Sequence, residues 1–217
     1  MNLLERYSTQ TDWITIIIVC CILLMTAAKL LFPKRFEEFI YLPLNNKYFL
    51  VQGRDDSLSH GFNLLFISIQ LLAMSLFIFI FLNEIGYNSK NSPGLFYIQI
   101  CALYAVFIGA KIFIEKIIGN IFNIENLVNQ YLYQKLTYRN YIGIFILVCN
   151  ILLIYSFGTN RTVLLILLAA TVAFNGIWLL FSYKNFRSIL IPHFLYFILY
   201  LCALEIAPYM ILYKAVT

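Results

Sequence analysis

The sequence predicts an all-α polytopic membrane protein with about six transmembrane helices plus one amphipathic interfacial helix. Of the 217 residues, 62% are apolar and only 12% are charged, whereas soluble domains have about 45–50% apolar and about 25% charged residues. The apolar runs last about twenty residues, the length at which a helix crosses a hydrocarbon core roughly 30 Å thick. They lack the apolar–polar alternation of barrel strands, so helices are the expected spanning elements.

The apolar runs form one integral-membrane domain over residues 1–217. Pro33 ends the first run, because proline cannot continue a helical hydrogen-bond ladder. Turn residues at 92–94 and 158–160 separate later runs. No internal repeat is visible in the sequence, so it lacks the repeat signature of many transporters. The predicted spans cover roughly 13–32, 62–82, 95–118, 140–157, 161–181 and 190–212.

Residues 121–139 carry apolar side chains at helical spacing on one side and polar side chains on the other. This pattern predicts an amphipathic helix that lies on the membrane surface or extends the third span. A connector packed on the bundle is the favoured role, and a docking surface for a partner is the alternative. The apolar positions are Ile121, Ile124, Leu127, Val128, Tyr131 and Leu132, and the polar positions are Asn123, Glu125, Asn126, Asn129, Gln130 and Gln134.

The distribution of Lys and Arg predicts the orientation, because cytoplasmic loops carry an excess of these residues. An even number of spans puts both termini on one side. With the termini outside, eleven Lys and Arg residues fall on the cytoplasmic side and four on the outer side. The opposite orientation inverts this ratio, so we expect both termini outside (periplasmic). The four outer residues are Arg6, Lys90, Arg161 and Lys214.

An acidic residue, Glu205, interrupts the last predicted span three residues before Pro208. Ionisable groups inside a bilayer are costly and mark candidate functional sites. Pro208 lacks an N–H, which leaves the Leu204 carbonyl without its helical donor. Arg161 begins the fifth span at a depth where it can pair with Glu205. Two roles stay open, namely a structural pair between helices and a proton- or cation-binding site for transport.

Secondary candidates lie on the third and sixth predicted spans. Lys111 and Glu115 stand four residues apart on one helix face. An ion pair within the helix, with the lysine stem reaching toward the interface, is the favoured interpretation. His193 follows Pro192 near the inner start of the last span. A lone interfacial histidine is more often structural.

The sequence predicts no metal, no cofactor and no catalytic site. Asp56 and His60 share a predicted helix face, but further metal ligands are missing. Residues 55–57 suit the N-cap of the second span. No serine lies on a strained glycine-rich turn of the kind that presents a nucleophile. No Lys/Arg cluster is dense enough to predict nucleic-acid binding. The apolar composition predicts the lipid bilayer and other membrane proteins as partners.

The chain resembles a known family at two places. One is 193–196 (His-Phe-Leu-Tyr) followed by 199–208, which ends in Glu-Ile-Ala-Pro, and the other is 31–36 (Leu-Phe-Pro-Lys-Arg-Phe). They are similar to the closing and early signatures of an uncharacterised bacterial multi-span inner-membrane family, a domain of unknown function. The resemblance implies a location in the bacterial cytoplasmic membrane and no particular activity. It adds weight to Glu205 as the residue to test first.

The function expected from the sequence is that of a non-enzymatic subunit or scaffold of a cell-envelope assembly. This expectation rests on the missing catalytic set, the missing repeat, the short outer loops and the few intramembrane charges. A small carrier or proton-coupled transporter that uses Glu205 is the alternative. An intramembrane enzyme ranks third.

Overall fold

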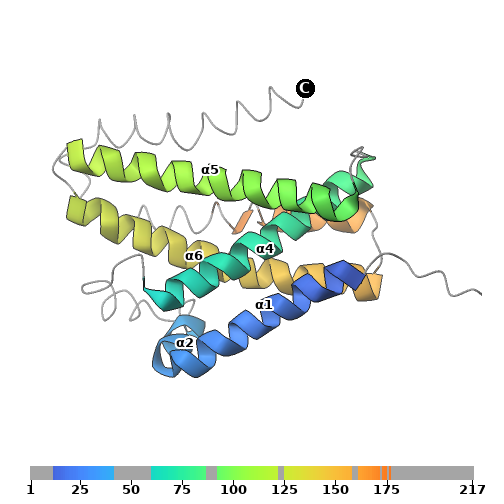
Figure 1. The fold of residues 1–217 in the computed structure, drawn as a ribbon, viewed down its shortest axis with the longest axis horizontal. Helices are drawn as coiled ribbons and strands as arrows, with labels where there is room; N and C mark the ends of the chain where they lie inside the picture. Colours follow the sequence, from blue (N-terminus) through green and yellow to red (C-terminus); the bar gives the residue numbers. More distant parts are fainter. Residues whose placement is uncertain are drawn as a thin grey trace, which may run out of the picture.

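Every secondary-structure element in the described part of the chain is a helix (Figure 1). The computed structural model describes residues 12–41, 60–86, 92–121, 125–157, 161–171, 173–174 and 176. The elements are α1 (Asp12–Leu31), α2 (Pro33–Ile40), α4 (Gly61–Glu84), α5 (Pro93–Ile121), α6 (Glu125–Leu152) and the π-helical η1 (Leu153–Phe157). A further short apolar helix covers Arg161–Thr171. The predicted all-α class is confirmed.

Four stretches of helix in the described residues are long and apolar enough to cross a membrane. They are Asp12–Leu31, Gly61–Glu84, Pro93–Ile121 and Tyr131–Ser156. The first three agree with the first three predicted spans to within a few residues, so the chain is a multi-span helical membrane protein. The predicted fifth span is described only in part, as Arg161–Thr171. The predicted sixth span, 190–212, lies outside the described residues, so the total of six stays a prediction.

The predicted interfacial helix and the predicted fourth span form one continuous helix, α6, which η1 prolongs. The helical conformation expected over 125–139 is therefore confirmed. Its position differs from the prediction, because Leu132, Gln134 and Leu136 are buried within the bundle. The amide of Gln134 donates to the Tyr138 hydroxyl at 3.4 Å. Gln134, one of the polar side chains that suggested a water-facing side, thus lies inside the protein, whereas Glu125 and Asn129 are exposed.

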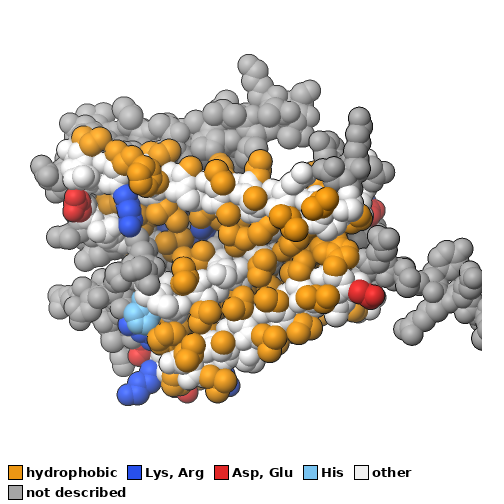
Figure 2. All heavy atoms as spheres, in the orientation of Figure 1, with side chains coloured by type: hydrophobic (Ala, Val, Ile, Leu, Met, Phe, Trp, Pro, Cys, Tyr) orange, Lys and Arg blue, Asp and Glu red, His pale blue; other side chains and the backbone are white. Residues whose placement is uncertain are grey.

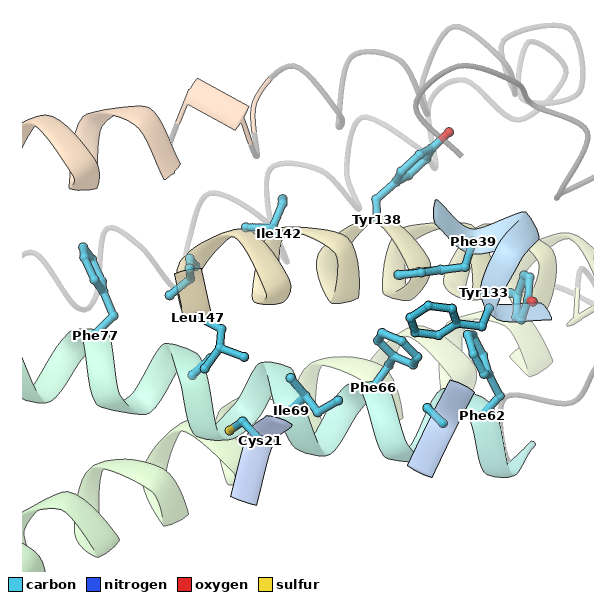
Figure 3. Close-up of a cluster of buried hydrophobic side chains, with 14 of the residues drawn as sticks. Cys21, Phe39, Phe62, Phe66, Ile69, Phe77, Tyr133, Tyr138, Ile142 and Leu147 are labelled. Atoms are coloured by element: carbon cyan, nitrogen blue, oxygen red, sulfur yellow. The ribbon is translucent and has the colours of Figure 1, made fainter. Parts of the chain in front are cut away.

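The short helix α2 covers one end of the bundle. Pro33 ends α1 as predicted and occupies the first turn of α2, where a missing N–H costs nothing. The buried ring of Phe39 lies 4.6 Å from that of Phe66 of α4, centroid to centroid. Figure 3 shows the rings of Phe39, Phe62 and Phe66 lying together. We call this end, where α1 and α5 finish and α4 and α6 begin, the α2 end.

The helix α4 starts at Gly61 and is capped by His60. The ring Nδ1 of His60 accepts a hydrogen bond from the Phe62 N–H at 3.3 Å. The cap therefore lies three residues beyond the predicted capping segment 55–57, which is itself outside the described residues. The ring of His60 also packs edge-on against Phe32, with centroids 5.1 Å apart. These contacts give His60 a structural role.

The helix α4 is the central element, in contact with α1, α5 and α6 (Figure 1). Its closest approach to α6 is at Gly143. A Cβ atom at this position would lie 2.8 Å from the backbone Cα of Gln70. Only glycine allows the two backbones to come so close. The backbones of α4 and α6 are thus closely packed at Gly143, beside the polar groups described next.

Candidate functional site

Polar side chains from three helices meet in the half of the bundle nearer the α2 end. We call this group the polar seam. Polar and ionisable groups at membrane depth are rare, face the bundle interior and mark candidate sites. The polar seam consists of Gln70 from α4, Tyr104 and Glu115 from α5, and Lys135 and Arg139 from α6.

A buried ion pair joins α5 to α6 within the polar seam. Lys135 Nζ lies 2.9 Å from Glu115 Oε1, and the Glu115 side chain is only 2% exposed. The second carboxylate oxygen, Oε2, has no hydrogen-bond partner among the described residues. The ammonium of Lys135 also lies 5.4 Å from the centroid of the Tyr131 ring. A buried carboxylate is tolerated when a charge of opposite sign pairs with it, and Lys135 supplies that charge.

Gln70 lies on α4, and its side-chain amide forms hydrogen bonds with residues of both α5 and α6. Its Nε2 donates to the Tyr104 hydroxyl at 3.1 Å. Its Oε1 accepts from Arg139 Nε at 3.2 Å. An amide has one acceptor and one donor end, so these two contacts fix its orientation. One buried side chain therefore ties α5 and α6 to the central helix.

Asn150 extends the polar contacts along the α4–α6 interface toward the other end. Asn150 is fully buried and its Nδ2 donates to the Ala73 carbonyl at 2.8 Å. Asn63 and Asn140 are also buried. Amide side chains of this kind join helices across membrane interiors. The interface between α4 and α6 is therefore held by polar contacts as well as by apolar packing.

The structure describes only some of the residues singled out in the sequence. Glu115 is buried and forms an ion pair with Lys135 of α6, whereas the predicted pair of Glu115 with Lys111 within α5 stays a prediction. Lys111 lies one turn before it on α5 and is half-buried. Arg161 is the exposed first residue of its helix. Glu205, Pro208 and His193 lie outside the described residues, so the Arg161–Glu205 pair stays a prediction.

Four members of the polar seam were not singled out as site residues from the sequence, namely Gln70, Tyr104, Lys135 and Arg139. Gln70 is a lone long amide inside an otherwise apolar run. Lys135 and Arg139 stand four residues apart and thus share a helix face. Within the described part of the chain, no group of His, Cys, Asp and Glu lies close enough to hold a metal ion. The chemistry available in the polar seam is proton exchange and hydrogen bonding.

Comparisons with known proteins place the chain in a family. No curated protein and no solved structure matches it. The family model described as Domain of unknown function (DUF4271) matches residues 14–216, nearly the whole chain. The resemblance to an uncharacterised family that was read from the sequence is confirmed. The chain belongs to the family Domain of unknown function (DUF4271).

Proposed function

We propose that the protein is a non-enzymatic subunit or scaffold of a membrane-embedded assembly in the bacterial cell envelope. The observation that supports this most is the exposure of α5. Only 11% of its apolar stretch is buried, against 50% for α4 and 56% for the span on α6. Within the described part of the chain, α5 thus has little contact with the other helices, and most of its surface there is open to lipid or to another protein.

One face of α5 suits contact with a helix of another membrane protein. Gly109 lies on this face, and no atom lies within 4 Å of the position that its Cβ would take. A glycine inside a helix costs about 1 kcal/mol relative to alanine, and membrane helices use small residues where another backbone comes close. The exposed residues that form this face are Ala102, Val106, Gly109 and Ala110. We assign this α5 outer face to a partner helix.

A photo-reactive amino acid at Val106 should form a defined cross-link with a partner protein in intact membranes. Val106 is 71% exposed, whereas Ile108 on the opposite side of the same helix is 6% exposed. The probe at Ile108 is the matched control and should react only within the chain. Adducts of equal yield from both positions, or lipid adducts alone from Val106, would contradict the partner assignment.

Fusions to reporter enzymes test the proposed orientation in the bacterial inner membrane. The α2 end carries Lys29, Lys34 and Lys116 by the direction of their helices, and such an excess favours the cytoplasmic side. An enzyme that matures only outside the cytoplasm should be active when fused after Thr217 and inactive when fused after Tyr41. Activity of a cytoplasmic reporter after both Tyr41 and Thr217 would exclude an even number of spans.

A small carrier or proton-coupled transporter is the second candidate function, and the polar seam favours it. Glu115 is a buried carboxylate, and its Oε2 has no hydrogen-bond partner among the described residues. A carboxylate is a group that can bind a proton. The sequence suggests the same role in proton or cation binding for Glu205. The variants of Glu115 and Lys135 described in the Discussion separate the two functions, since a scaffold tolerates removal of both charges and a carrier that depends on Glu115 does not.

A further inference from the structure

A groove opens at the α2 end, where α5 finishes and α6 begins. Its volume is about 260 Å³. Gly119 is buried at its base, and a Cβ there would lie 3.1 Å from the Val128 side chain, so glycine keeps the two helices close below the opening. The groove is lined by Lys116, Gly119, Asn120, Glu125, Val128 and Asn129.

The groove lies at the depth of lipid headgroups. The 29 residues of α5 extend over about 44 Å at 1.5 Å per residue, which exceeds a hydrocarbon core of about 30 Å. At least one end of α5 therefore emerges from the hydrocarbon. Polar residues are concentrated at the end that forms the groove, and Figure 2 shows acidic and basic side chains beside the apolar surface there.

The groove offers charges of both signs on exposed side chains. The Lys116 ammonium is a donor to phosphate, and the amides of Asn120 and Asn129 add neutral donors. The Glu125 carboxylate accepts hydrogen bonds from a primary ammonium group. None of the six lining residues is aromatic, whereas quaternary ammonium groups are held by aromatic cages. This set of groups therefore matches a ligand with one phosphate and one primary amine.

An apolar stripe leads from the groove along α5 into the bilayer. Phe113, Ile117 and Ile121 are exposed and lie at helical spacing beside Lys116 and Asn120. A molecule whose polar part fills the groove would therefore lay its hydrocarbon part along this stripe. The neighbouring polar and apolar surfaces favour a lipid over a soluble amino-phosphate.

We propose that this groove is a binding site for the headgroup of a phosphatidylethanolamine-type lipid. Its phosphate binds Lys116 and the two asparagine amides, and its ammonium binds Glu125. Its acyl chains pack on Phe113 and Ile117. The site is separate from the polar seam and from the choice of function made above.

Native mass spectrometry of the full, delipidated chain tests the proposal with three defined lipids of equal chain length. Phosphatidylethanolamine should bind about tenfold more tightly than phosphatidylcholine or phosphatidylglycerol, a factor that corresponds to about 1.4 kcal/mol. Glu125→Gln should remove the preference for ethanolamine over choline. Lys116→Gln should weaken binding of all three lipids. Lys29→Gln, an exposed lysine at the same end on α1, is the matched control and should change nothing.

Soluble phosphoethanolamine provides the second arm of the test. It should compete only at concentrations far above those of the lipid, because it cannot use the stripe on α5. Competition at equal concentration would assign the groove to a soluble amino-phosphate and overturn the lipid proposal. Equal binding of the three lipids, or a preference that survives both groove variants in correctly folded protein, would overturn the site itself.

Discussion

Replacing Gly143 by valine is expected to abolish the stable folded bundle. Even the Cβ of alanine at this position would lie 2.8 Å from Cα, Cβ and Cγ of Gln70. Because one of these atoms belongs to the α4 backbone, the clash cannot be relieved by rotating a side chain. Overpacking by one methyl group typically costs about 1–3 kcal/mol, and the branched valine adds to that cost.

The measurement is thermal unfolding of the detergent-solubilised full chain, together with the yield of monodisperse protein. Gly143→Ala should lower the melting temperature by several degrees, and Gly143→Val should leave almost no monodisperse protein. Gly94→Ala is the control, because no atom lies within 4 Å of its Cβ position. A Gly143→Val protein as stable as the original would mean that α4 and α6 do not pack in this way.

Removing one charge of the Glu115–Lys135 pair is expected to be much more damaging than removing both. Lys135→Met leaves the carboxylate of Glu115, 2% exposed in the original protein, without its cation. Loss of one partner from a buried pair typically costs about 3–5 kcal/mol, whereas apolar replacement of both partners is often neutral. The double variant, with Glu115→Leu added, should therefore recover most of the lost stability.

A double-mutant cycle on the melting temperature and on unfolding by denaturant checks this expectation. Glu115→Gln is a useful addition, because it removes the charge and keeps a side chain that can hydrogen-bond. If the destabilisations of the two single variants add up to that of the double variant, the 2.9 Å contact contributes nothing to the fold.

The same double variant separates the two candidate functions. A scaffold lacking both charges should still form the Val106 cross-link, since the α5 outer face is unchanged. A carrier that uses Glu115 should assemble normally and lose its activity. If the double variant cannot replace the original protein in cells whose growth depends on it, with cross-linking intact, the carrier is favoured.

Local signals in the sequence predicted much of the fold because the bilayer imposes a simple rule. Lipid satisfies no backbone hydrogen bonds, so apolar runs of span length must be helical. That rule located α1, α4 and α5 to within a few residues. It also placed the end of α1 at Pro33, because proline lacks the N–H that the next turn needs.

The polar contacts inside the bundle were harder to predict, because spacing along one helix says nothing about its neighbours. Four-residue spacing suggested Lys111 as a partner of Glu115, and only the structure shows the ion pair of Glu115 with Lys135 of α6. In the sequence, Gln70 is recognisable only as an amide residue within an apolar run. Its contacts with Tyr104 and Arg139 depend on where two other helices cross α4.

The sequence by itself therefore determined the class of the protein and the position of its first three spans, since both follow from hydrophobicity and helix length. Only the tertiary structure decided that residues 125–152 form one helix and that Lys135 and Arg139 of this helix bond to side chains of other helices. An amphipathic pattern is the same whether water or a polar side chain of another helix satisfies its polar face. That choice depends on packing between segments far apart in the chain, such as Gly143 against Gln70.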